Sequence, residues 1–224
     1  MTDARRVVVT GVGLLSPLGI GTAPTWDGLL AGRSGIGPVT RFDVSAYETR
    51  FAGELTGFDA TRYLDRKEVR RFDAFIHYAV AAAAMAMDDS GLRIEADRAD
   101  RSGVLIGTGI GGLPLMERTH STLVEKGPGR VTPFFIPGMI VNMASGLISI
   151  RYGAKGPNSA PATACSTGLH AIGDAFRLIQ TGRADAMIAG GTEGVITPLT
   201  FAGFNAMKAL SKRNDEPEKA SRPW

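Results

Sequence analysis

Residues 162–168 read Ala-Thr-Ala-Cys-Ser-Thr-Gly and place the only cysteine of the chain, Cys165, directly before an amphipathic helix pattern. The apolar residues that follow recur at helical spacing: Leu169, Ile172, Phe176 and Ile179. The unpaired backbone N–H groups at a helix N-terminus carry about half a positive charge and favour a thiolate over a thiol. We therefore predict that Cys165 is an activated nucleophile, against the ordinary reading of a lone cysteine as a buried structural residue.

Apolar strand patterns alternate with helix patterns along the chain. The predicted strands are Val7–Thr10, Val104–Ile106 and Ala186–Ala189. The predicted helices are Thr25–Leu30, Thr61–Asp73, Ala74–Ser90, Leu115–Glu125, Pro137–Tyr152, the segment from the Cys165 turn to about Thr181, and Pro198–Leu210. This order predicts an α/β fold with a largely parallel or mixed sheet that is covered on both faces.

Length and composition suit one large globular domain or two small ones. The chain has 224 residues, of which 44% are hydrophobic and 21% charged. A single cysteine excludes an internal disulfide framework, and no stretch approaches the roughly 18 apolar residues of a membrane span. The net charge of +3 does not argue for a nucleic-acid partner. We expect a soluble cytoplasmic protein with no membrane partner.

The last residues, Ser211–Trp224, are polar and follow an otherwise well-formed core pattern. The alternative is a surface tail that happens to end in an aromatic residue, but ordered domains tend to bury their aromatics. We predict that the chain ends within a longer protein.

A glycine-rich turn, Gly107–Gly112, follows a predicted strand and satisfies the G-x-G-x-x-G spacing of a dinucleotide-binding turn. That fingerprint also needs a helix that begins at once and an acidic residue about 20 positions later. Pro114 follows immediately, and residues 126–130 are loop-like and contain no acid. We predict that these glycines allow close packing beside a pocket, and keep a dinucleotide-binding oxidoreductase as an alternative.

One concentrated basic patch stands out, because Lys67, Arg70 and Arg71 share a face of a predicted helix that also contains Arg66. A solvated helix face is the ordinary explanation. The functional alternative is a dock for an acidic partner.

The three histidines do not form an evident pair with the cysteine. His77 lies in the Ala-rich helix, His120 in a polar segment, and His170 points about 100° or more away from a thiol at the helix start. Activation of Cys165 is therefore expected from the helix terminus or from groups outside this chain.

Several motifs together resemble the β-ketoacyl-acyl carrier protein synthases, and among them most closely the type II elongating synthases of bacterial fatty acid synthesis. The motifs are Thr163–Gly168, the Gly107–Gly112 turn, Val141-Asn142-Met143-Ala144, Ala189-Gly190-Gly191-Thr192-Glu193, and Ala209-Leu210-Ser211 with Arg213-Asn214-Asp215. Members of that family are about twice as long, so the resemblance implies that residues 1–224 are the N-terminal half. It also implies the thiolase fold, of which this chain would form the N-terminal half of a five-layer α-β-α-β-α architecture, and a homodimer.

The resemblance further implies an acyltransferase activity that needs no metal or redox cofactor. Cys165 would accept an acyl chain from acyl-acyl carrier protein as a thioester. Malonyl-acyl carrier protein would then decarboxylate, and its carbanion would attack the thioester to lengthen the chain by two carbons. The backbone N–H of Cys165 would be one donor of the oxyanion hole.

Two groups of binding residues come from the same resemblance. Ile110 matches the position that gates the acyl pocket, and Phe135 and Phe204 match positions in or beside that pocket. A basic surface that would receive the acidic carrier protein is formed by Lys67, Arg70, Arg71 and Lys208.

The family's two catalytic histidines, its active-site lysine and its second oxyanion-hole donor all belong to the C-terminal half. We therefore expect this chain alone to be inactive or nearly so, and to self-associate through an exposed apolar face. An alternative function is a non-catalytic protein that binds the carrier protein or pairs with a separately encoded second half.

Overall fold

The computed structural model describes residues 5–223, which form two compact units. The first unit contains the chain up to Gly13 and Ala60–Gly194. The second contains Leu14–Asp59 and the residues from Val195 onward. Trp224, the terminal aromatic residue on which the prediction of a longer protein rested, lies outside the described residues.

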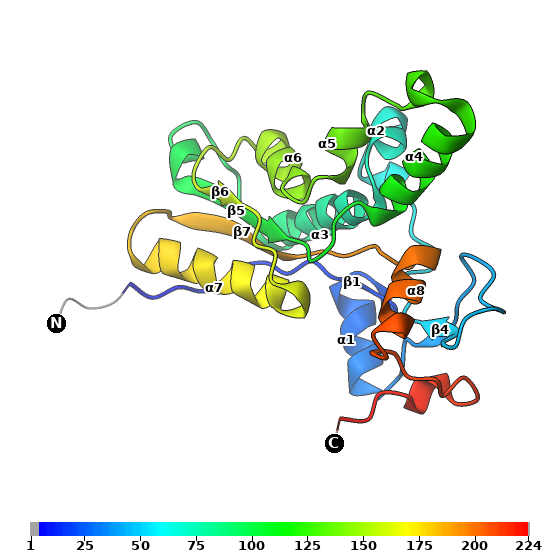
Figure 1. The fold of residues 1–224 in the computed structure, drawn as a ribbon. Coiled ribbons are helices and arrows are strands. Elements are labelled where there is room, and N and C mark those ends of the chain that lie inside the picture. The colour runs from blue at the N-terminus through cyan, green and yellow to red at the C-terminus, as the bar shows by residue number, and fades with distance from the viewer. Residues whose placement is uncertain (1–4, 224) are drawn as a thin grey trace. The chain divides into compact units, whose positions relative to one another are not determined.

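A three-stranded parallel sheet lies at the centre of the first unit, in the order β6-β5-β7 (Figure 1). The central strand β5 (Ser102–Gly107) is buried at every residue, because α6 (Met143–Tyr152) packs against it from one side and α7 (Thr167–Gln180) from the other. Strands β6 (Asn158–Ser159) and β7 (Ala186–Gly191) flank it. The predicted α/β arrangement and the two apolar strands at 104–106 and 186–189 are confirmed.

Helix α3 (Ala74–Ser90) has the predicted bounds, and none of its residues before Asp88 is exposed. It packs on α6 (Figure 1) and forms the main core with the sheet. The fully buried large side chains of this core are Phe75, Ile76, Val80, Val104 and Ile148. Such all-round burial suits a helix that has few polar residues before Asp88.

A buried hydroxyl ties α6 to the sheet. Ser145 Oγ accepts a hydrogen bond from the backbone N–H of Ile106 at 3.3 Å. It also lies 3.0 Å from the Val104 carbonyl and 2.9 Å from the Ser159 carbonyl, to either of which it can donate. One side chain on α6 thus contacts both β5 and β6, which satisfies polar groups that burial would otherwise make costly.

The predicted strand at Val7–Thr10 is wrong. These residues are extended but belong to no strand of the described chain, and Val8 and Val9 are 60% and 80% exposed. The reason is that the following residues pack against α3 instead of the sheet: a Cβ at Gly13 would lie 1.9 Å from the carbonyl oxygen of Ala82. A run of valines predicts an extended backbone, but only a neighbouring strand makes it part of a sheet.

Two of the helix predictions differ from the structure in their limits. The helix expected at 61–73 is a 3-10 turn, η1 (Ala60–Arg62), followed by the short helix α2 (Arg66–Arg71). The helix expected at 137–152 is divided into α5 (Phe135–Met139) and α6, because Ile140 is extended. Helix α4 (Leu113–Lys126) matches the expectation.

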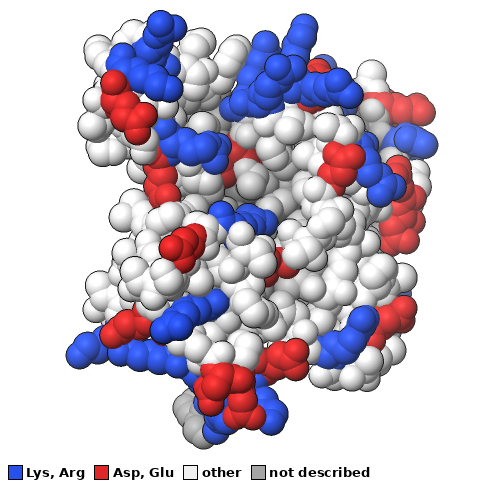
Figure 2. Space-filling view, turned by 90° about the vertical axis from the view of Figure 1, so that its right-hand side faces the viewer, with Lys and Arg blue, Asp and Glu red and all other residues white. Residues whose placement is uncertain are grey.

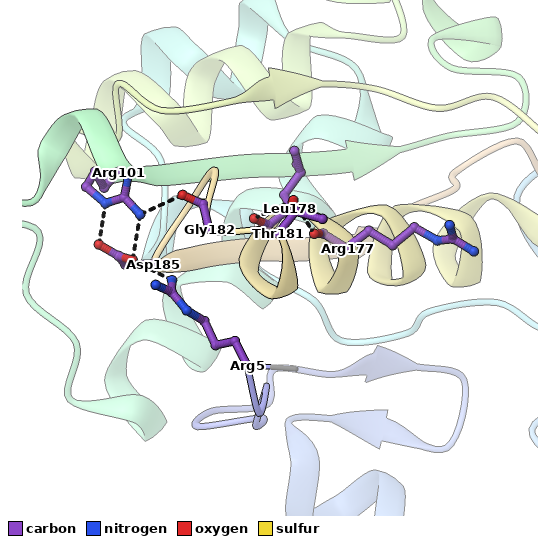
Figure 3. A network of polar contacts seen from close by, with 7 residues as sticks. All are labelled: Arg5, Arg101, Arg177, Leu178, Thr181, Gly182 and Asp185. Atoms are coloured by element: carbon purple, nitrogen blue, oxygen red, sulfur yellow. Dashed lines mark hydrogen bonds and ion pairs between the residues drawn. The ribbon is translucent and has the colours of Figure 1, made fainter. Parts of the chain in front are cut away.

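The amino ends of β5 and β7 are joined by an ion-pair network (Figure 3). Asp185 accepts hydrogen bonds from Arg101 Nε at 2.5 Å and Nη2 at 2.8 Å, and from Arg5 Nη1 at 3.0 Å. Arg101 also donates to the carbonyl of Gly182. These contacts lower the pKa of Asp185 from 3.8 to about 2, and the bidentate hydrogen bonds from Arg101 have a larger effect than the contact with Arg5.

This lowered pKa predicts a pH-dependent contribution to stability. Because the folded state holds the carboxylate form, the contribution is present above the unfolded pKa of about 3.8 and is lost as pH falls toward about 2. We expect Asp185→Asn to lower the melting temperature at neutral pH, and this difference from the parent to shrink below about pH 4. Circular dichroism melts across this range would measure it, with the exposed Asp97→Asn as a control for simple charge removal. A difference that stays constant down to pH 3 would contradict the assignment.

The second unit contains two antiparallel strand pairs, β1 (Leu15–Ser16) with β2 (Gly19–Ile20) and β3 (Gly37–Pro38) with β4 (Phe51–Ala52). Its helices are α1 (Thr22–Leu30) and α8 (Pro198–Ala206). The aromatic rings of Phe42, Tyr47 and Phe201 pack edge to face.

The polar segment after α8 is attached to this second unit. Asn214 accepts from the backbone N–H of Arg50 at 2.8 Å and donates to the carbonyl of Glu48 at 2.8 Å. Helix α8 ends before the predicted limit of Leu210, because Lys208 has a left-handed backbone with φ 58°. Among the helices of residues 5–223, none is both long and apolar enough to cross a membrane.

Candidate active site

Cys165 lies where sequence analysis placed it, in a 3-10 turn (η4, Ala164–Ser166) that leads directly into α7. Its side chain is exposed. The turn stands beyond the carboxyl ends of the parallel strands β5 and β7, which is where ligands bind in open α/β sheets. The thiol therefore combines solvent access with the partial positive charge of a fourteen-residue helix.

The turn holds a strained backbone directly before Cys165. Ala164 has φ 50°, in the left-handed region that an alanine rarely adopts. Buried Thr167 stabilises this conformation, since its hydroxyl accepts from the Thr163 N–H at 2.8 Å and donates to the Ala164 carbonyl at 2.7 Å. One side chain thus fixes the backbone on both sides of the strained residue.

Glycines allow this turn to approach the sheet. A Cβ at Gly107, the last residue of β5, would lie 2.3 Å from both Thr167 Cγ2 and the Pro161 carbonyl oxygen. A Cβ at Gly191, the last residue of β7, would lie 2.8 Å from the Cα of Gly168. Any side chain at these strand ends would push the nucleophile turn away from the sheet.

The carboxylate of Glu193 occupies the glycine-rich turn. Its Oε2 accepts from the backbone N–H groups of Gly109 at 3.0 Å and Ile110 at 3.1 Å. Its Oε1 accepts from the hydroxyl of buried Thr108 at 2.9 Å, and that hydroxyl in turn accepts from the N–H of Gly111 at 3.2 Å. The donors that a phosphate would need are directed at a carboxylate of the same chain.

The glycine-rich turn leads directly into a helix, contrary to the expectation drawn from Pro114. Pro114 does not delay the helix, because α4 begins at Leu113 and takes the proline into its first turn. Proline is tolerated there because that position lacks an intrahelical partner for its N–H. The dinucleotide alternative is disfavoured instead by the Glu193 carboxylate, which already binds the N–H groups of Gly109 and Ile110.

The histidines have other partners, as the sequence suggested. His170 lies between Thr163 Oγ1 (3.2 Å from Nδ1) and Asp174 Oδ2 (3.2 Å from Nε2). Burial lowers the pKa of His77, so this imidazole is held neutral in α3. His120 is exposed on α4.

The fold of this chain is found in known proteins. Residues 4–224 match the family described as beta-ketoacyl synthase, N-terminal domain. The chain is 56% identical to 3-oxoacyl-[acyl-carrier-protein] synthase 2 of Synechocystis sp., in an alignment that covers 99% of this chain and 53% of that protein. It is also 56% identical to the synthase of the same name from Vibrio cholerae, over 98% of this chain and 53% of that protein. The chain belongs to the β-ketoacyl synthase family.

Solved structures agree with this assignment. A beta-ketoacyl synthase from Burkholderia phymatum superposes with a TM-score of 0.85 at 32% identity, covering 97% of this chain and 54% of that one. The structure of a type II PKS acyl-carrier protein in complex with its ketosynthase matches with a TM-score of 0.79 at 29% identity, covering 94% of this chain and 51% of that one. The fold is the thiolase-like fold of these ketosynthases, as predicted, and the chain spans about half the length of the relatives it matches.

Two of the three predicted acyl-pocket residues of this ketoacyl synthase chain lie in the first unit. Ile110 is on the glycine-rich turn and its side chain is 41% exposed. Phe135 is half-buried at the start of α5, whose last residue, Met139, accepts a hydrogen bond from the N–H of Gly112. Phe204 is half-buried on α8 in the second unit.

The predicted basic surface is present on α2, where Lys67, Arg70 and Arg71 are all exposed. Arg71 stacks over the ring of Phe134, 4.2 Å from its centroid, which places this cation beside α5. Lysine and arginine side chains gather at the upper edge of the face in Figure 2, the end where Figure 1 draws α2 and α4. Lys208, the fourth predicted residue, is exposed in the second unit.

The helix that carries these cations is firmly capped. Asp65 and Glu68 form a reciprocal capping box at its N-terminus. Glu68 also accepts hydrogen bonds from Arg151 Nη2 at 3.0 and 2.9 Å. Asp65 and Glu68 therefore stabilise the helix. Its cations Lys67, Arg70 and Arg71 remain exposed.

Sequence reasoning missed the two side chains that organise the site. Thr167 and Glu193 were quoted within motifs but given no role. The available signals were a threonine two positions after the cysteine and a glutamate two positions after a strand that ends in two glycines. In the described part of the chain, no cluster of three or more His, Cys, Asp or Glu residues could hold a metal ion.

The role of Thr167 predicts a measurable loss of stability. Thr167→Val keeps the shape of the side chain but leaves the Thr163 N–H and the Ala164 carbonyl without this partner. We expect a loss of about 1–3 kcal/mol in unfolding free energy and slower alkylation of Cys165. Urea denaturation and iodoacetamide labelling would measure both. Thr122→Val, at a half-buried threonine of α4 whose hydroxyl donates to the Arg118 carbonyl of its own helix, is the matched control, and equal losses in the two variants would contradict this role.

Proposed function

We propose that this chain is the nucleophile-bearing half of a 3-oxoacyl-acyl carrier protein synthase. The observation that carries the proposal is the exposed Cys165 thiol at the N-terminus of α7, held by the strained Ala164 turn at the strand ends of a ketoacyl synthase domain. The relatives bearing that enzyme name are 50–57% identical to this chain.

In the proposed acylation, the Cys165 thiolate attacks the thioester carbonyl of an acyl-acyl carrier protein. The C–S bond to the carrier's thiol breaks, that thiol leaves and takes up a proton, and the acyl group remains on Cys165. The backbone N–H of Cys165 would donate to the oxygen on which charge develops. The helix terminus favours the thiolate before the attack and so supplies the nucleophile.

The condensation step is proposed to need a second half of the enzyme. After acylation, malonyl-acyl carrier protein would lose carbon dioxide, and the carbanion would attack the acyl-Cys165 thioester. The resemblance assigns the histidines and lysine for this step to the C-terminal half. His170, the histidine nearest to Cys165 in sequence, is instead paired with Thr163 and Asp174.

The first test is acylation of the chain itself. We expect the mass of the purified protein to increase by one acyl group after incubation with an acyl-acyl carrier protein, and Cys165→Ala to show no increase, because Cys165 is the only thiol. Intact-mass spectrometry measures this directly. An adduct that persists in Cys165→Ala would place the acylated group elsewhere.

Condensation is tested in the same samples with malonyl-acyl carrier protein. The expected result is no ketoacyl product from this chain alone and product after addition of a C-terminal half from a relative. Robust product from the chain alone would overturn the proposed need for a second half.

The acyl chain is proposed to lie beside Ile110, Phe135 and Phe204. Ile110 supports this assignment because its backbone belongs to the turn that packs against the nucleophile turn: a Cβ at Gly109 would lie 3.4 Å from the Cα of Ala164. The assignment of Phe135 and Phe204 rests on the resemblance.

The carrier protein is proposed to dock on the basic surface of α2 together with Lys208. One structural relative is a ketosynthase in complex with an acyl-carrier protein, which supports a partner of this kind. Exposed cations at Lys67, Arg70 and Arg71 suit an acidic protein, because opposite charges speed association and orient the complex.

Charge reversal on α2 tests this surface. We expect Lys67→Glu with Arg70→Glu to weaken carrier-protein binding about tenfold or more and to reduce its salt dependence. Titration by fluorescence anisotropy at two salt concentrations would measure both effects. Lys155→Glu, at an exposed lysine near the amino end of β5, is the control and should bind as the parent does. Equal binding by the double variant would exclude α2 as the dock.

A pairing function is the second candidate, and a specific observation favours it. The outer face of α7 exposes Leu169 (77%), Ile172 (50%) and Phe176 (43%). An apolar helix face of this kind commonly marks an interaction surface. The chain would then act as one half of a synthase that is completed by a second polypeptide. We further propose, on the resemblance, that the complete enzyme is a cytoplasmic homodimer.

A further inference from the structure

We propose that Glu193 is a positioning residue that holds the turn carrying Ile110 and so determines which acyl chain lengths reach Cys165. The inference rests on the proposed function, in which Ile110 gates the acyl pocket. It assigns a task to a carboxylate that neither the nucleophilic attack nor the carrier dock uses.

The geometry of the contact carries the proposal. One carboxylate accepts three hydrogen bonds from consecutive residues of a single turn: from the hydroxyl of Thr108 and from the N–H groups of Gly109 and Ile110. Through Thr108 the same network reaches the N–H of Gly111. Four successive residues are therefore oriented by one side chain.

The charge of the carboxylate makes this contact strong. Hydrogen bonds to an ionised acceptor are about twice as strong as neutral ones. Adjacent backbone N–H groups that converge on one point form an anion-binding concavity, and here the anion belongs to the protein. The glycines at 109 and 111 suit this turn, since Gly111 has φ 78° and a Cβ at Gly109 would lie 3.1 Å from Glu193 Oε2.

The contact also links the Ile110 turn to the nucleophile turn. Glu193 is the second residue after β7, and the residue between them, Thr192, donates its N–H to the carbonyl of Gly107 at 3.0 Å. Gly109 lies between Glu193 and Ala164, with a Cβ there 3.4 Å from the Ala164 carbonyl oxygen. The carboxylate is therefore anchored on the sheet, and it holds Ile110 at a fixed distance from the residue preceding Cys165.

The backbone of the proposed gate residue, Ile110, is therefore fixed, while its side chain can rotate. The N–H of Ile110 is bound by Glu193, and the side chain is 41% exposed. Opening then requires rotation about the side-chain bonds of Ile110 and no displacement of the turn. If Glu193 is removed, the whole turn can move and the gate discriminates less between short and long chains.

The first arm of the test measures the hydrogen bonds without any substrate. Amide hydrogen exchange of Gly109 and Ile110, followed by NMR, should be about tenfold faster or more in Glu193→Ala than in the parent. Glu193→Gln should give an intermediate rate, because its amide oxygen can still accept from the two N–H groups. Glu125→Ala, at an exposed glutamate of α4, is the matched control and should leave both rates unchanged.

The second arm measures discrimination by chain length. Cys165 is the only thiol, so N-ethylmaleimide and a maleimide with a long alkyl tail report on access to one atom. We expect the ratio of their labelling rates to shift by about threefold or more in Glu193→Ala, with a smaller shift in Glu193→Gln and none in Glu125→Ala. A variant that is merely less stable would change both rates together and leave this ratio unchanged.

The outcomes separate this inference from the proposed function. Unchanged exchange in Glu193→Gln and Glu193→Ala would overturn the positioning contact, and faster exchange with an unchanged ratio would overturn its role in chain-length selection. If Glu193→Ala does not fold, the Glu193→Gln variant decides both points. Neither arm uses a carrier protein or a second half, so failure of acyl transfer by the parent chain would count against the proposed function alone.

Discussion

The close approach of α7 to the carboxyl ends of β5 and β7 is the constraint on which the rest of the site depends. Gly107 and Gly191 end the two strands, and Gly168 lies in the first turn of the helix, with no space for a Cβ at either strand end. At the start of this helix, the buried hydroxyl of Thr167 bonds the backbone on both sides of Ala164. The strained turn and the exposed Cys165 thiol follow from that contact.

The second contact that organises the site is electrostatic, and it joins the Glu193 carboxylate to the glycine-rich turn that follows β5. A glycine-rich turn after a strand is a ready anion site, and in dinucleotide-binding proteins it binds a phosphate. Here the Glu193 carboxylate fills that position, so the turn is closed by the protein itself. The same local backbone chemistry thus supports a turn closed by the protein's own carboxylate in place of a cofactor site. What distinguishes the two uses is the glutamate two positions after β7.

The sequence predicted some elements well because their causes are local. The Ala-rich α3 has the predicted bounds, since a long run of helix-favouring apolar residues needs no distant partner to define it. The strand at Val7–Thr10 failed for the opposite reason, because an extended run becomes a strand only beside another strand. The break between α5 and α6 was likewise invisible, since the Met139 carbonyl is taken up by Gly112 from a distant segment.

The sequence by itself determined where the thiol lies, because a lone cysteine among small residues before an amphipathic helix defines both the helix terminus and the access to the thiol. It also located the basic face of α2, which follows from helical spacing alone. The partners of Thr167 lie only three and four positions before it in the chain. Only the tertiary structure assigned Glu193 its partners, because they lie more than eighty positions away, and no local pattern encodes which donor a side chain will meet after folding.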